Sequence, residues 1–497
     1  MAFADAAGAL QMANVFSNFL EQARLTSQAL LEYGNNLFEP TVRLGVTGLS
    51  RAGKTVFITA LVHGLLRGGR FPVFEALASG RIAGARLSPQ PDDTIPRFAY
   101  EAHLDALLKG REWPESTKQI SELRLVIDYQ SQSGSMRELT LDIVDYPGEW
   151  LLDLPLLNLS YEDWSRQTIH LSQQKDRAHL AADWHRDLAI LDPLAPENEL
   201  AAQVAAQHFT QYLRSCRDER FALSLLPPGR FLMPGELADS PALTFAPLDR
   251  LDGSAPSGSL WAMMRRRYES YKDAVVRPFY RDHIARLDRQ VVLVDALTAL
   301  NAGPDAVHDL ERALIAILDS FNIGRNSILS ALFSPRIDRI LFAATKADLL
   351  HHTSHDKLER ILERLVSDAA KRADFTGAKI DAIAMASVRA TREANVGGSL
   401  QAIVGTPLAG EQAGGRVFDG QSEIVIHPGD LPDDPERIFN GGDGGFRGLA
   451  SASSDDADYR FLRFRPPLLE RTEAGIPALP HIRLDRALEF LIGDRLR

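Results

Sequence analysis

Short apolar runs recur along the chain, and most are followed by stretches in which apolar positions return with a helical period. Runs with strand character occupy residues 42–47, 121–129, 138–147, 290–297, 336–350 and 379–387. Alternation of such runs with helical patterns predicts a parallel sheet covered by helices. The second and third runs are joined by the turn-like QSQSGSM and predict an antiparallel hairpin within this sheet. The pattern therefore predicts an α/β protein with a mixed, mostly parallel sheet.

Helical patterns and changes in composition divide the chain further. The region between the hairpin and the next strand is helical in composition and far longer than an ordinary connection, which predicts an inserted domain. Glycine-rich, acidic loops and short strands follow the last core strand, and a helical pattern closes the chain. The predicted parts are an N-terminal helix, a first core segment, a helical insertion, a second core segment and a C-terminal α+β subdomain, at 1–39, 40–150, 151–289, 290–395 and 396–497.

Composition and charge exclude several classes of protein. The net charge of -11 and the pI near 5.7 argue against a nucleic-acid binder, because such affinity comes largely from clustered Lys and Arg. The single cysteine, Cys216, excludes an internal disulfide and fits a reducing compartment. No apolar run reaches the roughly 18 residues of a membrane span. We therefore expect a cytoplasmic protein, with contact to a membrane surface through the basic run at 263–272 as the alternative.

A glycine loop between the first strand and the next helix carries the clearest chemistry. Residues 48–55, GLSRAGKT, fit the P-loop pattern G-x-x-x-x-G-K-[ST] in full. In such a loop the backbone N–H groups surround phosphates, Lys54 places a cation near the β- and γ-phosphates, and the Thr55 hydroxyl binds Mg²⁺. The nucleotide contacts predicted here are Ser50, Arg51, Ala52, Gly53, Lys54, Thr55 and Val56.

Two further segments predict the Mg²⁺ and γ-phosphate contacts. Asp145 and Gly148 belong to D-Y-P-G at the end of a hydrophobic strand, where an acidic residue supports Mg²⁺ and the glycine N–H reaches the γ-phosphate. A switch threonine should precede the antiparallel strand. Thr117 has that position, and Thr94 is the alternative because it lies farther from the strand. The predicted metal ligands are Thr55, Thr117 and Asp145.

Two loops at the ends of later strands predict a guanine site. The carboxylate of Asp348 in T-K-A-D can accept hydrogen bonds from the ring N–H and the amine of guanine, a donor pair that adenine lacks on that edge. A helix N-cap is the alternative role for Asp348. The side chain of Lys346 should pack along the base, and a backbone N–H of A-S-V should meet the guanine oxygen. The predicted base contacts are Lys346, Asp348, Ala386, Ser387 and Val388.

The order of these motifs resembles a Ras-type GTPase domain, although Thr345 stands where Asn is commoner. The chain resembles the YcjX family of bacterial stress-associated P-loop proteins more closely. The segments that carry this resemblance are GLSRAGKTVFITALVHGLL, WPESTKQISELRLVIDY, DIVDYPGEWLLDLPLL, LFAATKADLLHH and LPHIRLDRALEFLIGDRL. It runs nearly end to end and implies a cytoplasmic or membrane-peripheral nucleotide-binding protein with a Ras-like P-loop GTPase core.

Several residues of these motifs bear on hydrolysis. Glu149 follows Gly148, where many small GTPases have a glutamine that orients the attacking water. A carboxylate there would be repelled by a γ-phosphate unless it is protonated or turned away, which predicts slow hydrolysis. Arg51 has two roles open to it: a built-in arginine finger, or an ion pair with a neighbouring carboxylate. Trp113 and Ser116 are predicted to pack against or cap the nucleotide, with core packing as the alternative for Trp113.

We therefore predict a conformational switch that binds GTP or GDP with Mg²⁺, with the helical insertion as its output toward a protein partner. The residues predicted to act in hydrolysis are Arg51, Lys54, Thr117, Gly148 and Glu149. A P-loop ATPase, in which Asp348 makes another contact, is one alternative. A non-hydrolysing scaffold that holds nucleotide as a structural element is the other.

Overall fold

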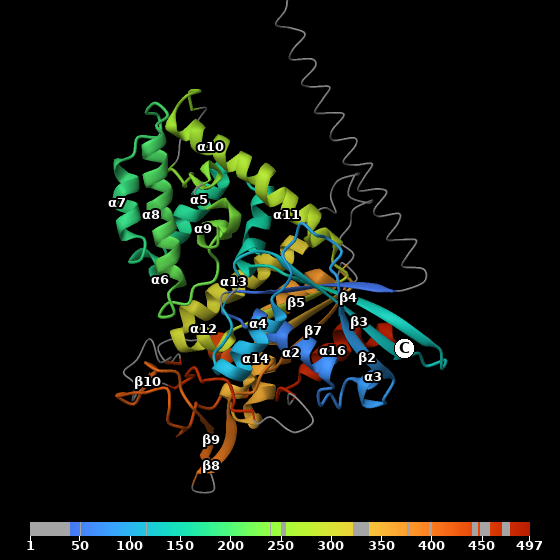
Figure 1. Cartoon of the computed structure of the whole chain (residues 1–497). Coiled ribbons are helices and arrows are strands. Elements are labelled where there is room, and N and C mark those ends of the chain that lie inside the picture. Colours follow the sequence, from blue (N-terminus) through green and yellow to red (C-terminus); the bar gives the residue numbers. More distant parts are fainter. Residues whose placement is uncertain are drawn as a thin grey trace, which may run out of the picture.

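The computed structural model shows a central sheet with a helical lobe on one side and a small β-rich part below it (Figure 1). The residues that the structure describes are 40–49, 51–115, 117–238, 240–249, 255–321, 337–374, 378–396, 400–439, 446–447, 458–469 and 478–497. The helix predicted within 1–39 lies outside these residues, as do Ser50 and Ser116.

The central sheet has seven strands in the order β2-β3-β4-β1-β5-β6-β7. In chain order these strands are β1 (Thr41–Gly48), β2 (Ile82–Ser88), β3 (Ser121–Gln130), β4 (Met136–Asp145), β5 (Arg289–Val294), β6 (Arg339–Ala344) and β7 (Lys379–Ala384). From β4 to β7 every neighbouring pair is parallel, whereas β3 pairs antiparallel with both β2 and β4. The predicted mixed sheet and its hairpin are confirmed.

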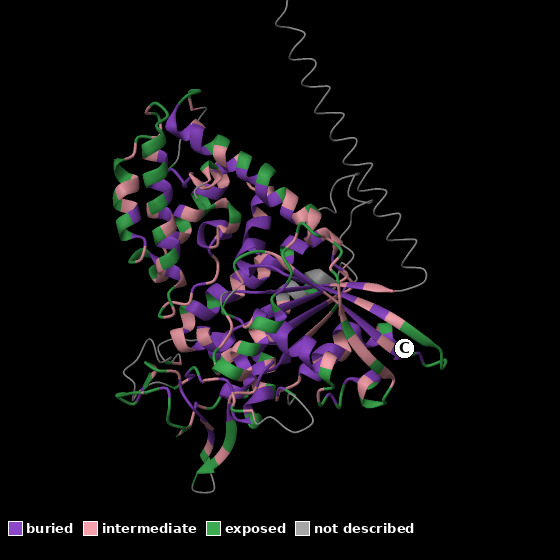
Figure 2. Ribbon diagram, in the orientation of Figure 1, coloured by how far each residue is buried: buried purple, intermediate pink, exposed green. Residues whose placement is uncertain are grey.

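The central strands of the sheet are largely buried (Figure 2). Their alternate residues belong to two hydrophobic cores. In β5, Val291 and Leu293 belong to one core, and Val292 and Val294 belong to the other, as the period of two in a strand requires. The first core includes residues of α2 (Lys54–Arg67) and α16 (Leu484–Ile492). The helices whose residues fill the second core include α12 (Ala296–Ala302), α13 (Pro304–Phe321) and α14 (His355–Asp374).

The region between β4 and β5 is helical, and its apolar side chains continue the second core without a break. It begins with the 3₁₀ segment η2 (Gly148–Asn158), which leads directly out of the D-x-x-G loop. Ser160, Asn198 and Ser259 cap the three main helices by accepting a backbone N–H. The helices are α5 (Tyr161–Ser172), α6 (Lys175–Ala178), α7 (Ala182–Ile190), α8 (Glu199–Arg217), α9 (Gly229–Leu232), α10 (Leu260–Tyr271), the π-helical η5 (Lys272–Val276) and α11 (Arg277–Asp282).

The C-terminal part contributes a second, three-stranded sheet and returns to the first core. Its elements include β8 (Arg392–Val396), β9 (Leu400–Gly405), β10 (Gln412–Ala413), β11 (Arg416–Val417), β12 (Ile424–Ile426) and α15 (Glu436–Phe439). The short helices α3 (Glu75–Ala78) and α4 (Tyr100–Asp105) come earlier in the chain, before and after β2. The strands of the small sheet follow the order β12-β9-β8. Within the described residues, no helix combines the length and the apolarity needed to span a bilayer.

Two details differ from the predicted strands. The edge strand β2 was not predicted, because it contains Gly84 and Ala85 and shows no clear alternation of buried and exposed positions. Residues 460–467, RFLRFRPP, read as a strand in the sequence, but their ladder pairing amounts to one isolated bridge between Phe464 and Pro407. The predicted division of the chain into domains stays a prediction.

Candidate functional site

The P-loop joins β1 to α2 in the geometry of a phosphate cradle. Gly53 has a left-handed φ of 81° and forms the N-cap of α2, a conformation that favours glycine. Lys54 is buried at the start of the helix, and its Nζ donates to the backbone oxygen of Gly48 at 3.2 Å. A helix N-terminus next to a buried ammonium group is a site for an anion.

The three predicted metal ligands, Thr55, Thr117 and Asp145, lie next to one another. The Thr117 hydroxyl donates to Asp145 Oδ2 at 2.6 Å, and the hydroxyls of Thr55 and Thr117 are 3.4 Å apart. Burial raises the pKa of Asp145 to about 6, although Lys54 lowers it. The other carboxylate oxygen, Oδ1, is buried and has no hydrogen-bond partner among the described residues. Two hydroxyls and a carboxylate with an unused oxygen are the hard oxygen ligands that suit Mg²⁺.

Thr94, the alternative switch residue, is not part of this cluster. Its hydroxyl and its backbone N–H both donate to Asp92, and its side chain is exposed. Thr117 is therefore the threonine that the fold brings to the phosphate end of the site.

The D-x-x-G loop lies directly against the P-loop. Gly148 is buried, and a Cβ atom placed on it would lie 2.0 Å from the backbone oxygen of Gly48. The close approach of these two backbones leaves no room for a side chain at position 148. The two loops that would contact the phosphates are thus in direct contact with each other.

The opposite end of the site is formed by the loops after β6 and β7. Lys346 has a left-handed φ of 62°, and its ammonium group pairs with Asp295, which caps α12. Asp348 is buried, and its Oδ2 accepts the backbone N–H of Ala390 at 2.8 Å. Burial raises the pKa of Asp348 to about 6, while the Ala390 N–H lowers it, so the carboxylate is ionised at neutral pH.

The A-S-V segment also borders this end. The N–H of Ala386 donates to the backbone oxygen of Ile482 at 3.0 Å, so that amide is already engaged. Ser387 and Val388 follow it and line the same cavity as Asp348. A base contact from this segment would therefore come from one of these two residues.

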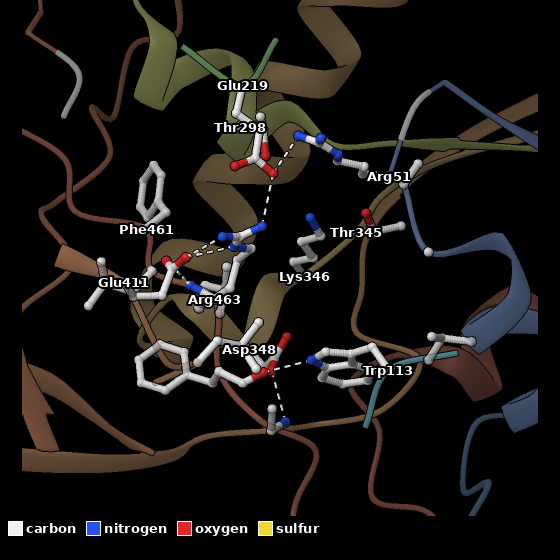
Figure 3. A pocket seen from close by; sticks show the side chains of 18 of the residues that line it. Arg51, Trp113, Glu219, Thr298, Thr345, Lys346, Asp348, Glu411, Phe461 and Arg463 are labelled. Carbon is white, nitrogen blue, oxygen red and sulfur yellow. Dashed lines mark hydrogen bonds and ion pairs between the residues drawn. The ribbon is translucent and has the colours of Figure 1, made fainter. Parts of the chain in front are cut away.

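A cavity of about 970 Å³ connects the phosphate and base ends. Trp113 lines it and donates its indole N–H to the backbone oxygen of Phe464 at 2.7 Å (Figure 3). The C-terminal segment thus walls one side of the cavity and fixes Trp113. The cavity is lined by, among others, Arg51, Ala52, Gly53, Lys54, Thr55, Val56, Trp113, Thr117, Lys346, Asp348, Ala386, Ser387 and Val388. Its size is at the upper end of the range for small-molecule sites.

Arg51 and Glu149 both form ion pairs with the end of α8 and the turn after it. The Arg51 guanidinium contacts Glu219, and the Glu149 carboxylate accepts from Arg217 at 2.8 Å. Of the two roles considered for Arg51, the structure shows the ion pair. The Glu149 side chain is directed toward Arg217 and lines a smaller cavity beside the main one.

Sequence reasoning missed the residues that the insertion and the C-terminal part bring to the cavity. They include Glu219, Glu411, Phe461, Arg463 and Phe464, and no local motif marks any of these. Asp295 was also missed, but it carries a signal, since an acidic residue directly after the buried strand β5 lies at the same sheet edge as the other site loops.

A histidine cluster lies near the base end. His351 and His352 come together with Glu393, and their potential ligand atoms lie within 4.8 Å of one another. His352 Nδ1 already pairs with Glu393 at 2.9 Å, and the Nδ1 of His351 lies 3.0 Å from the hydroxyl of Thr353. These contacts give the three groups protein partners, and we assign them no role in the nucleotide site.

The sheet order and the P-loop between β1 and α2 define an α/β P-loop protein with a Ras-like core. The family model described as "YcjX-like family, DUF463" matches residues 42–496, and the chain belongs to this family. The chain is 40% identical over 479 residues to "Ras-like GTPase YcjX" of Escherichia coli, covering 92% of this chain and 96% of that protein. It is 36% identical over 488 residues to "Ras-like GTPase YcjX" of Shewanella oneidensis, with 92% and 94% covered. The resemblance inferred from the motifs is confirmed.

Proposed function

We propose that this chain binds guanine nucleotide with Mg²⁺ and hydrolyses GTP slowly as a conformational switch in the cytoplasm. The observation that carries the proposal is the convergence of the P-loop, the Thr117–Asp145 pair and the Asp348 loop around one cavity. Relatives that match almost the whole chain carry the name "Ras-like GTPase". Contact with a membrane surface is the alternative for its location.

At the phosphate end, Lys54 and the amides at the start of α2 would bind the β- and γ-phosphates. The hydroxyls of Thr55 and Thr117 would hold Mg²⁺, with Asp145 supporting it. The ion would neutralise charge between the β- and γ-phosphates. Gly148, which is in contact with the P-loop backbone, would report the γ-phosphate through its N–H.

Slow hydrolysis follows from the residue that comes after Gly148. Glu149 is engaged by Arg217, so its carboxylate is turned from the phosphate end and does not repel a γ-phosphate. On this proposal Glu149 does not orient an attacking water, and the glutamine that does so in many small GTPases is replaced at this position. We expect turnover in the isolated protein to require both Lys54 and Mg²⁺.

The helical insertion is suited to be the output of the switch. Asp153, in the 3₁₀ segment after Gly148, accepts the N–H of Gly229 at 2.6 Å and the hydroxyl of Tyr271 at 2.6 Å. Both donors belong to the insertion, and all three residues are buried. A displacement of the D-x-x-G loop would thus be transmitted to the insertion, which would present a surface to a protein partner.

Single-turnover hydrolysis of GTP by the purified protein tests this proposal. We expect slow, Mg²⁺-dependent release of phosphate from the wild type, and a loss of at least about tenfold in Lys54→Ala, since that variant lacks the charge-assisted contact to phosphate. Lys118→Ala is the matched control, because Lys118 is exposed and its ion-pair partner among the described residues is the nearby Glu115. Phosphate release that persists unchanged in Lys54→Ala would refute hydrolysis at this P-loop. Binding without any release would favour the scaffold alternative.

A further inference from the structure

One carboxylate joins three parts of the chain at the cavity. Glu219 lies in the turn after α8, and its Oε1 atom contacts the Arg51 guanidinium of the P-loop and Nη1 of Arg463 at 3.0 Å (Figure 3). Glu411 fixes Arg463 from the other side: it accepts Nε at 2.7 Å and the backbone N–H at 2.8 Å. We call this arrangement of Arg51, Glu219, Arg463 and Glu411 the Glu219 bridge. All four side chains line the cavity.

The same turn also contacts the second phosphate-sensing loop. Arg217, two residues before Glu219, pairs with Glu149 next to Gly148. The short stretch 217–219 of the insertion therefore holds one side chain from the P-loop and one from the D-x-x-G loop. One short stretch of the insertion therefore contacts both loops.

The charges of the Glu219 bridge favour its exchange for phosphate. Arg51 and Arg463 both contact the Glu219 carboxylate, Arg463 also pairs with Glu411, and the two arginine side chains are 50% and 52% exposed. Exposed ion pairs contribute little to the stability of a fold, so opening this one costs little. The terminal phosphate of a bound nucleotide offers more charge and more acceptor oxygens than a carboxylate, and guanidinium groups bind phosphate in a bidentate geometry.

We propose that Glu219 is a positioning residue that holds Arg51 and Arg463 off the nucleotide, and that the terminal phosphate of a triphosphate displaces it. This inference rests on the proposed function. The freed Arg51 then stabilises the charge that develops on the γ-phosphate, and Arg463, held by Glu411, supplies a second cation from the C-terminal part. The release of Glu219 also frees the turn at 217–219, so that the insertion responds to triphosphate and not to diphosphate.

The test is Glu219→Gln, which keeps the side-chain shape and removes its charge. We expect the affinity for a non-hydrolysable GTP analogue with Mg²⁺ to rise up to about fivefold, as the loss of an exposed ion pair allows, and the affinity for GDP to change by less than about twofold, because only the triphosphate competes with Glu219. Single-turnover hydrolysis of GTP at subsaturating protein should accelerate by the same factor, because binding of the triphosphate no longer has to displace Glu219. In the variant that combines Arg51→Ala and Arg463→Ala with Glu219→Gln, both gains should disappear, which a purely structural effect of Glu219 would not explain.

Glu197→Gln is the matched control, because Glu197 is an acid of the same insertion that pairs with Arg266 and does not line the cavity. It should leave both affinities unchanged. An unchanged ratio of triphosphate to diphosphate affinity in Glu219→Gln, or a gain that persists without both arginines, would overturn the inference while GTP binding by the wild type stands. If the wild type binds ATP and not GTP, the same series with an ATP analogue tests the bridge, and only the guanine assignment fails. If neither nucleotide binds, both proposals fail.

Discussion

Asp348→Asn should move the base preference of the protein from guanine to xanthine. The carboxylate already accepts the Ala390 N–H through Oδ2. An asparagine can keep that hydrogen bond with its amide oxygen and turn its NH₂ group toward the cavity. That NH₂ group would donate to the 2-carbonyl of xanthine. Against guanine it would meet N–H donors, and no hydrogen bond could form between them. We expect GTP affinity to fall by at least about a hundredfold and XTP affinity to rise correspondingly, since two hydrogen bonds to a charged acceptor are exchanged.

The substitution Asp348→Asn should not unfold the protein. Burial raises the pKa of Asp348 to about 6, so the folded state disfavours its charged form, and the neutral amide removes that penalty at neutral pH. Thermal unfolding of the free protein measures this, and we expect a midpoint no lower than that of the wild type. Asp356→Asn is the control, because Asp356 is an exposed carboxylate nearby that pairs with Arg483 outside the cavity. Loss of GTP binding without any gain for XTP would contradict the base-reading role of Asp348.

Gly148→Ala should separate the two phosphate-sensing loops. The added methyl group would lie 2.0 Å from the oxygen and 2.5 Å from the carbon of the Gly48 carbonyl, and both are backbone atoms that no rotamer change can move. We expect a loss of about 2–3 kcal/mol in the free energy of unfolding, the upper part of the range for overpacking. The D-x-x-G loop should also move from the P-loop, so GTP affinity should fall more than GDP affinity.

Urea unfolding and nucleotide titrations measure the two effects of Gly148→Ala. The control is Gly84→Ala, since a Cβ on Gly84 in the edge strand β2 would meet no atom within 4 Å. That variant should behave like the wild type in both measurements. If Gly148→Ala is as stable as Gly84→Ala and discriminates GTP from GDP normally, the contact between the loops has no part in sensing the γ-phosphate.

The sequence was sufficient to predict the parts of the site that depend on local pattern. Strand ends of a parallel sheet meet at one edge, so motifs placed after β1, β4, β6 and β7 had to converge. Thr117 could be chosen over Thr94 from its distance to the antiparallel strand alone. These predictions rely on short-range periodicity, which can be read from the sequence, and on the general geometry of parallel sheets.

The residues that sequence reasoning missed are brought to the site by tertiary packing. Glu219 and Arg463 lie far apart in sequence and meet only because the insertion and the C-terminal segment close over the same cavity. The strand β2 is stabilised by pairing with β3 and not by its own pattern, since it contains Gly84. A carboxylate could be anticipated as the ion-pair partner of Arg51. Which carboxylate it is could not, because the position of Glu219 depends on how the turn after α8 is folded.

The most direct test of the central claim is the competition of unlabelled GTP, GDP, ATP and ADP against a fluorescent guanine nucleotide bound to the wild-type protein with Mg²⁺. We expect guanine nucleotides to compete at least about a hundredfold better than adenine nucleotides, a difference of about 2.7 kcal/mol. Equal competition, or a preference for adenine, would contradict the assignment of Asp348 to the base and would support an ATPase of the same architecture.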